Sequence, residues 1–318
     1  MRLSPASLAL MLLAAHAACT AAPKAAPKPA PKAASEHQFG VIGHSFSNGG
    51  GEPLLEQSLA KTRGAGLAFV VATGVKSAKE PCSDMLYAHR RAMFDDARPP
   101  VIVVPAASDW AECKNSGGRL VGIERLNRLR ELLYAEDGAP AEQPLMLARQ
   151  SANGKFRSYA ENAHWSVGNV LYATVNLPSN NNHYRSEAGR NSEFEDRAVA
   201  NRFWLSRLFA LARRKKVDAL VLFSEGNPKV LSDEPGLLAR LGRSSGTQDG
   251  FAAPRRQIVT LAAQFEGKVL LIDTAPVANG SEPTIAWRGN LGHVSIGARA
   301  VQVHVAPRGE TLFRIEQP

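Results

Sequence analysis

The stretch VIVVPAASDWAEC, from Val101 to Cys113, shows how this chain is built. Its first four residues are apolar and β-branched, which predicts a short strand covered on both faces. Pro105 ends this strand and a polar loop follows. In open α/β sheets, ligands bind at the carboxyl ends of the strands. Ala106, Ala107 and Ser108 therefore stand where an enzyme often places its reactive groups, but they supply only methyl groups and a hydroxyl.

The rest of the chain alternates similar apolar runs with helical patterns. Six runs predict strands: Phe39–Gly43, Leu67–Thr73, Val101–Val104, Val170–Leu177, Ala219–Phe223 and Val269–Ile272. Three patterns between these runs predict helices. The first helix is capped by Ser83 and carries Met85, Ala88 and Ala92 on one face, and the second has the apolar stripe Ile123, Leu126, Leu129 and Leu133. The third spans Phe194–Arg214, with Phe203, Leu208 and Leu211 facing inward. This alternation predicts an α/β sandwich.

The C-terminal segment has a different period. Val301, Val303 and Val305 alternate with polar residues, a turn follows at 307–309, and a second apolar run begins at Leu312. Alternation on both sides of a turn predicts an antiparallel hairpin, with His304 on its solvated face.

The composition is that of a folded, basic protein. Its 318 residues, 44% of them hydrophobic, suffice for one large domain or two small ones, and 7% aromatic residues argue against global disorder. The net charge of +9 favours anionic partners such as nucleic acid, anionic lipid or cell-wall polymers. However, the densest basic run, Arg213–Lys216, ends a predicted helix, where cations complement the helix dipole. We therefore predict an ordinary basic surface and no nucleic-acid module.

The N-terminus predicts export. Arg2, the apolar core Leu8–Leu13 and the A-x-A site Ala15–Ala17 are typical of a signal peptide, assigned to residues 1–17. Cys19 follows small residues, as in lipidated bacterial cysteines, but His16 stands where leucine is usual. A lipoprotein whose only membrane contact is an anchor at Cys19 and a soluble periplasmic or secreted protein both stay open. Residues 18–37 form a Pro/Ala/Lys-rich, extended linker, and residues 38–318 form the folded domain.

Two cysteines remain in the folded region. Cys82 and Cys113 each follow a predicted strand closely, so loops at one edge of a sheet can bring them together. In an oxidising compartment this predicts a disulfide, with two buried thiols as the alternative. The pair lacks the neighbouring ligands that a structural metal site requires.

The strand ends and the segments between them resemble the calcineurin-like metallophosphoesterases, in particular an exported bacterial branch. The resemblance runs from Phe39 to the C-terminus and is carried by VKSAKEPCSDMLYAHRRAMFD (75–95), SDWAECKNSGG (108–118), ERLNRLREL (124–132), LPSNNN (177–182) and WLSRLFALA (204–212). It implies a sandwich of two mixed β-sheets flanked by helices. It also implies two metal ions at the strand ends, which clamp a phosphate and activate water.

The ligands that such metals need are missing from this chain. His44 stands at the position of the first aspartate, Val75 follows Gly74 where an aspartate is expected, and Ala106–Ser108 replace a Gly-Asp-Asn motif. Ser224 and Glu225 replace a histidine, and Asp273–Pro276 replace the final histidine motif. The degenerate pocket would then comprise His44, Ser45, Gly74, Ser108, Asp109, Glu225 and Asp273.

Two other sites would use the same loops. His44, Glu225 and Asp273 could hold a single divalent, zinc-like ion, since three protein ligands and a water suffice. Ser45 could act as a nucleophile with His293 or His304 as its base, although the chain has no G-x-S-x-G elbow. The plainest interpretation of His44 is a turn histidine bonded to the backbone.

A polar loop follows the fourth strand. Asn180, Asn181 and Asn182 favour a turn, since asparagine bonds its own backbone, and Tyr184 and Arg185 follow them. The same loop could bind a glycan or a phosphate. Taken together, these patterns predict a catalytically inactive module of the cell envelope, which binds an anionic ligand or a protein partner or serves as a scaffold. No cofactor is expected. An active phosphoesterase with a partial metal site and a metal-free hydrolase at Ser45 are the alternatives.

Overall fold

The computed structural model describes residues 36–44, 51–134, 145–185, 191–233, 248–278, 280–307, 309 and 311–316. The predicted signal peptide, Cys19, most of the linker and Ser45 lie outside these residues. Within them, no helix is long and apolar enough to cross a membrane.

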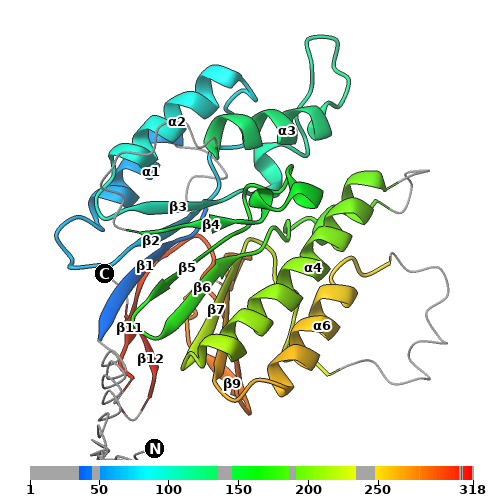
Figure 1. Cartoon of the computed structure of the whole chain (residues 1–318). Helices are drawn as coiled ribbons and strands as arrows, with labels where there is room; N and C mark the ends of the chain where they lie inside the picture. The colour runs from blue at the N-terminus through cyan, green and yellow to red at the C-terminus, as the bar shows by residue number, and fades with distance from the viewer. Residues whose placement is uncertain are drawn as a thin grey trace, which may run out of the picture. The chain divides into compact units, whose positions relative to one another are not determined.

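Two mixed sheets form the centre of the domain (Figure 1). The first has the order β12-β11-β1-β2-β3, formed by Phe313–Glu316, Ala300–Val305, His37–Ile42, Val70–Thr73 and Val101–Val104. The second has the order β4-β5-β6-β7-β8-β10-β9, formed by Ala148–Arg149, Ala163–Val167, Val170–Thr174, Ala219–Ser224, Lys268–Asp273, Leu291–Ser295 and Ala286–Arg288. The predicted α/β class with two mixed sheets and flanking helices is confirmed, and all six predicted strands are present.

The inner faces of the two sheets pack on each other through aromatic side chains. Phe39 on β1 lies 5.3 Å from Tyr172 on β6, and Phe69 lies 5.2 Å from Trp165 on β5, measured between ring centroids. Edge-on packing of this kind is favourable for aromatic rings. Because helices cover the outer faces, the central parallel strands are buried on both sides, which explains their continuous apolar sequences.

Helices cover the outer face of each sheet. Next to the first sheet lie α1 (Gly51–Ala60), α2 (Asp84–Asp96) and α3 (Gly122–Leu133), and next to the second lie α4 (Ser192–Lys215) and α6 (Ala252–Ala263) (Figure 1). Short 3₁₀ turns, η1 (Ala107–Asp109), η2 (Gln150–Ala152), η3 (Gly154–Phe156) and η4 (Asn181–His183), connect these elements.

The helix α2 begins as predicted but buries a different face. Ser83 is its N-cap and accepts a hydrogen bond from the backbone N–H of Leu86. Met85, Ala88 and Ala92 are exposed, however, and the buried residues are Tyr87, Arg90 and Phe94. The prediction of the apolar face was therefore wrong. An arginine lies on the buried face because two carboxylates neutralise it, with Glu52 and Glu80 each 2.5 Å from the guanidinium.

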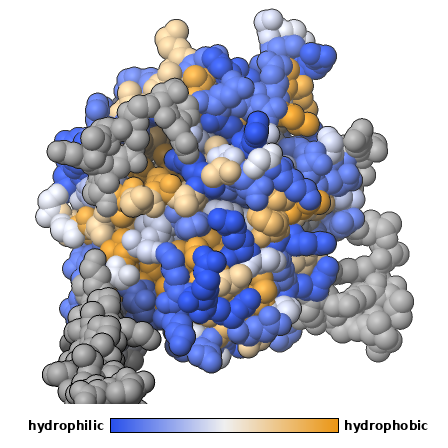
Figure 2. All heavy atoms as spheres, in the orientation of Figure 1, coloured by the Kyte–Doolittle hydropathy of each residue, from blue (hydrophilic) through white to orange (hydrophobic). Residues whose placement is uncertain are grey.

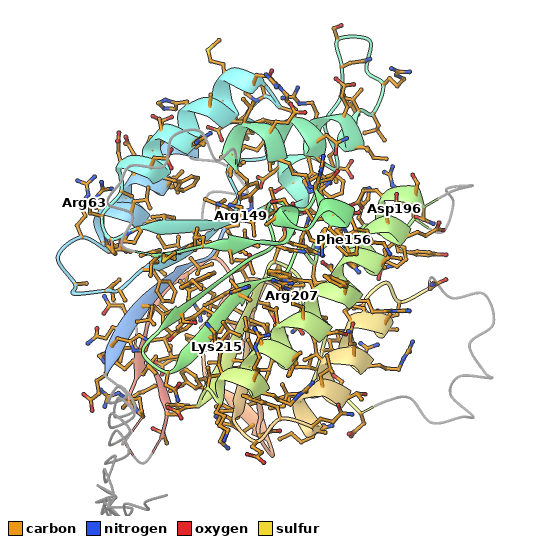
Figure 3. The ribbon with its side chains drawn as sticks, in the orientation of Figure 1. Arg63, Arg149, Phe156, Asp196, Arg207 and Lys215 are labelled. Carbon is orange, nitrogen blue, oxygen red and sulfur yellow. A yellow bond between two sulfur atoms is a disulfide. The ribbon has the colours of Figure 1, made fainter. Side chains whose placement is uncertain are left out.

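Of the other side chains predicted to face the core, two are exposed and two, Leu133 and Leu211, are partly buried. Ile123 on α3 is 49% exposed and Phe203 on α4 is 38% exposed, whereas their stripe neighbours Leu126, Leu129 and Leu208 are buried. Phe203 packs on Phe156 of η3, at 4.8 Å between centroids; Figure 3 labels Phe156 beside α4. On α3 and α4, the residues at the centre of the predicted apolar face are therefore buried, and those at its margin are exposed.

The last strands form the edge of the first sheet. β11 pairs antiparallel with both β1 and β12, and His304 lies on β11 opposite Gln38, near the beginning of β1. Its Nε2 is 2.9 Å from a carboxylate oxygen of Glu316. His304 is therefore at the end of the sheet opposite the carboxyl end of β1.

The predicted disulfide is confirmed. Cys82 and Cys113 are bonded, with their Cα atoms 5.9 Å apart, and join the loop after β2 to the loop after β3. The alternative of two buried thiols is wrong.

Candidate functional site

The loops that follow the parallel strands of both sheets meet at one end of the sandwich. His44, Gly74 and Ser108 follow β1, β2 and β3, while Glu225 follows β7 and Asp273 ends β8. A hydrogen bond from the backbone of Ala107 to Glu225 joins the two groups of loops. This strand-end cluster is where the sequence predicts the site.

His44 is held by the backbone of a neighbouring loop. Its Nε2 lies 2.8 Å from the carbonyl oxygen of Lys76, which can only accept, so Nε2 carries the proton. Nδ1 lies 3.5 Å from the hydroxyl oxygen of Ser108. Gly74 has φ +81°, and a Cβ there would come within 2.6 Å of the imidazole ring. The glycine thus leaves the space that the histidine fills.

Asp109 anchors two loops of the first sheet. It is fully buried, and its oxygens accept hydrogen bonds from the backbone N–H groups of Val75 (3.0 Å), Lys76 (3.2 Å) and Ala106 (2.7 Å). Burial raises the pKa of Asp109, while His44 and these donors act in the opposite direction. The carboxylate of Asp109 therefore holds the backbone of the two loops in place and does not face an open site.

Lys76 was missed by sequence reasoning. Its side chain is buried, and Nζ donates to the carbonyl oxygens of Ser77 (2.9 Å) and Ser108 (3.3 Å). Burial lowers the pKa of Lys76, against the attraction of Asp109 and Glu80. Lysine is rarely buried, so the residue type gave no reason to expect Lys76 in this cluster. Its position directly after Gly74 and Val75 was the one signal in the sequence that pointed to it. The chain thus supplies a cation of its own beside Asp109.

Glu225 links the two sheets. Its Oε2 accepts hydrogen bonds from the N–H groups of Ala107 (2.7 Å) and Ser179 (2.9 Å), and its Oε1 accepts one from the Ser179 hydroxyl (2.8 Å). Ala107 follows β3, and Ser179 lies in the loop after β6 of the other sheet. Burial raises the pKa of Glu225 to about 7, although the hydrogen bonds favour the charged form.

Asp273 pairs with a histidine that sequence reasoning assigned elsewhere. Its Oδ2 lies 2.6 Å from Nε2 of His293 on β10, and its Oδ1 accepts from the N–H of Ala275 at 3.1 Å. The hydroxyl of Ser295 is 3.5 Å from the same Nε2. A serine–histidine–aspartate relay uses the two different ring nitrogens, so this cluster is not arranged as one. His304 lies at the end of its sheet opposite the carboxyl end of β1, and Ser45 lies outside the described residues.

The metal ions implied by the family resemblance do not fit these residues. In the parts of the chain that the structure describes, no three histidine, cysteine, aspartate or glutamate side chains form a group that could hold a metal ion. His44, Glu225 and Asp273 therefore do not form the single-ion site that the sequence suggested. Ala106 and Ala107 provide no side-chain ligand. The oxygens of Asp109 accept from backbone N–H groups, and those of Glu225 accept from backbone N–H groups and from the Ser179 hydroxyl.

The asparagine loop is built by its own hydrogen bonds. Asn180 accepts from the backbone N–H of His183, the amide of Asn181 bonds both Gln248 and Gly250, and Asn182 donates to Gly250 and accepts from Arg197. Asn181, Asn182 and His183 all have positive φ, which asparagine tolerates better than most residues. Tyr184 packs edge-on against Phe194 at 5.3 Å, and Arg185 is exposed. The three asparagines therefore stabilise the turn itself.

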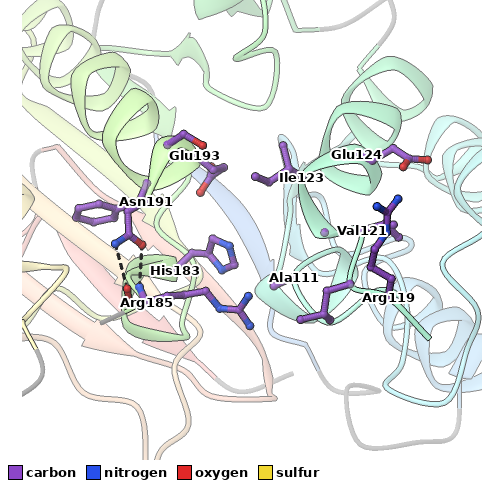
Figure 4. A pocket seen from close by; sticks show the side chains of 13 residues that line it. Ala111, Arg119, Val121, Ile123, Glu124, His183, Arg185, Asn191 and Glu193 are labelled. Carbon is purple, nitrogen blue, oxygen red and sulfur yellow. Dashed lines mark hydrogen bonds between the residues drawn. The ribbon is translucent and has the colours of Figure 1, made fainter. Parts of the chain in front are cut away.

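A hollow of about 340 Å³ lies next to this loop (Figure 4). One wall comes from the beginning of α3 and the residues before it, and the other from His183, Arg185 and the beginning of α4. Arg185 and His183 extend from their wall toward the segment that carries Ala111 (Figure 4). Elsewhere the visible surface is mainly hydrophilic with scattered apolar groups (Figure 2).

Comparison with known proteins gives no assignment: the chain matches no known protein family and no curated protein.

Proposed function

We propose that this chain is a non-catalytic binding module built on a metallophosphoesterase-like sandwich and exported to the bacterial cell envelope. The observation that carries the proposal is the state of the strand-end carboxylates. Asp109 and Glu225 each accept three hydrogen bonds from within the chain, and Asp273 is bonded to His293 and Ala275.

Recruiting these carboxylates to a metal would be costly. An ionised carboxylate has about four acceptor sites, and Asp109 and Glu225 each already use three of them. A metal that displaced these donors would leave buried N–H groups without an acceptor, at a cost of about 1–3 kcal/mol each. The buried ammonium group of Lys76 adds electrostatic repulsion toward any divalent cation placed beside Asp109. These groups hold the loops of both sheets in position, which suits a domain that presents a fixed surface.

The envelope assignment rests on two further features. The first residues have the pattern of an export signal, followed by an extended linker. The disulfide Cys82–Cys113 suits an oxidising compartment.

Hydrolysis assays test the proposal. Purified protein without its first 35 residues is incubated with 4-nitrophenyl phosphate and bis(4-nitrophenyl) phosphate, with and without Mn²⁺ or Zn²⁺, beside the variant Ser45→Ala. We expect no turnover above buffer from either protein. Metal-dependent turnover would show an active phosphoesterase. Metal-independent turnover that disappears in Ser45→Ala would show a hydrolase at Ser45.

A further inference from the structure

The hollow between the beginnings of α3 and α4 combines positive charge with exposed apolar side chains (Figure 4). Its lining residues lie outside the strand-end cluster, although Ala111 and Glu124 belong to segments that carry the family resemblance. Arg119 and Arg185 supply the charge, from opposite walls. Their guanidinium groups form no hydrogen bond or ion pair with any residue that the structure describes. By contrast, the arginines at 90, 130 and 197 are all bonded to carboxylates.

The acidic residues of the hollow only partly offset this charge. Both carboxylate oxygens of Glu193 are bonded to Arg197, at 2.7 and 3.0 Å, so this pair is neutral as a whole. Glu124 contributes one exposed negative charge. His183 is half-buried against Trp110, and burial lowers its pKa, so it is neutral near pH 7. Among the described residues that line the hollow, two arginines and one glutamate leave a net charge of about +1, which suits a monoanion.

The ends of both helices reinforce the positive potential. Neither α3 nor α4 has a side chain that caps its first turn. The N-cap residue of α4, Asn191, instead bonds the backbone of Arg185 twice, accepting from its N–H at 2.9 Å and donating to its carbonyl oxygen at 3.0 Å (Figure 4). Asn191 thus fixes the backbone of Arg185 at the rim. The first-turn N–H groups of both helices donate to no N-cap side chain, and their positive ends face Glu124 on α3 and Glu193 and Glu195 on α4.

The remaining wall is apolar. Leu120 is 41% and Ile123 is 49% exposed, and Phe194 also lines the hollow. Large apolar side chains at this exposure next to unpaired arginines suit a ligand with a charged head and an apolar body.

We propose that this hollow binds a small organic monoanion, a carboxylate that carries an aromatic or branched aliphatic group. A guanidinium group matches a carboxylate in two parallel hydrogen bonds, and the apolar body lies against Ile123 and Leu120. A phosphate dianion fits less well, because Glu124 leaves only one uncompensated positive charge. The inference rests on the proposed function in one respect, that the chain acts by binding.

Titration calorimetry with benzoate, inorganic phosphate and benzyl alcohol as probes tests this site. Benzoate is expected to bind saturably and more tightly than the other two. Arg185→Ala and Arg119→Ala should each weaken benzoate about tenfold, as the loss of a charge-assisted hydrogen bond implies. Ile123→Ser should weaken it about threefold, and Arg63→Ala, an exposed arginine outside the hollow, should leave it unchanged. Thermal melts confirm that each variant is folded.

Several results would overturn the inference. They are the absence of saturable benzoate binding, tighter binding of phosphate than of benzoate, or equal weakening by Arg63→Ala and Arg185→Ala. None of these outcomes affects the hydrolysis assays, since the altered residues lie outside the strand-end cluster. Conversely, metal-dependent turnover would remove the proposed function and leave the benzoate result standing.

Discussion

The buried carboxylate of Glu225 makes a quantitative prediction about stability and pH. Its pKa rises from an ordinary 4.5 to about 7 in the fold, because burial disfavours the charged form. The pKa of Glu225 is higher in the folded state than in the unfolded state. The stabilising contribution of Glu225 is therefore fully present below pH 4.5 and is lost as the pH rises through about 7. Linkage then gives a loss of about 2.5 kcal/mol between pH 5 and pH 8.

The variant Glu225→Gln isolates this effect. Glutamine can keep all three contacts: its carbonyl accepts from the N–H groups of Ala107 and Ser179, and its amide donates to the Ser179 hydroxyl. We therefore expect the variant to match the natural protein at pH 5 and to be more stable by about 2.5 kcal/mol at pH 8.

Urea denaturation at both pH values measures the difference, and Glu56→Gln, at an exposed glutamate, is the matched control. Glu225→Ala should be less stable by about 1–3 kcal/mol at pH 8, since the buried N–H of Ala107 loses its acceptor. A gap between the natural protein and Glu225→Gln that is the same at pH 5 and pH 8 would refute the reasoning.

Three further changes test the framework around the cluster. Cys82→Ala or reduction of the Cys82–Cys113 bond, which spans 31 residues, should lower the free energy of unfolding by about 3–4 kcal/mol in denaturant titrations; an unchanged midpoint under dithiothreitol would contradict this. Lys76→Met should cost about 2–4 kcal/mol, since it leaves two carbonyl acceptors and Asp109 without their cation, whereas the exposed Lys61→Met should be neutral. Gly74→Ala should cost at least about 1–3 kcal/mol, from positive φ and from contact with the imidazole; a melting temperature equal to that of the natural protein would show that the loop adapts freely.

The glutamate bridge also explains what the loops of the strand-end cluster do. In the strand-end cluster, Glu225 joins the loop after β3 to the loop after β6, so one side chain ties the carboxyl ends of two sheets. Asp109 ties the loop after β2 to the loop after β3 in the same way. Carboxylates at such strand ends can therefore stabilise loops as well as serve chemistry.

The strands and the disulfide were accessible from sequence because each depends on local signals. Runs such as Val101–Val104 are too apolar to be exposed, and Cys82 and Cys113 follow neighbouring strands. The face of α2 was not accessible, because Arg90 is buried only through carboxylates 10 and 38 positions away along the chain. A helical pattern records hydrophobicity, and it carries no information about partners that neutralise a buried charge.

The sequence predicted which strand-end residues lie close together, but it did not predict how they bond. Topology brought His44, Gly74, Ser108, Asp109 and Glu225 to one end of the sandwich, as the strand ends imply. The bonds among them depend on loop conformations that no periodicity encodes. For the same reason Lys76 in the cluster and Arg119 of the hollow were not singled out, whereas Arg185 was named together with the asparagine loop.

The most direct test of a non-catalytic strand-end cluster is the metal content of the folded domain. Protein without its first 35 residues is loaded with manganese, zinc and iron, dialysed, and analysed by inductively coupled plasma mass spectrometry. The account predicts no metal above the level of a dialysed control protein. Two metal ions per chain, or one that is lost in the variant His44→Ala, would contradict it.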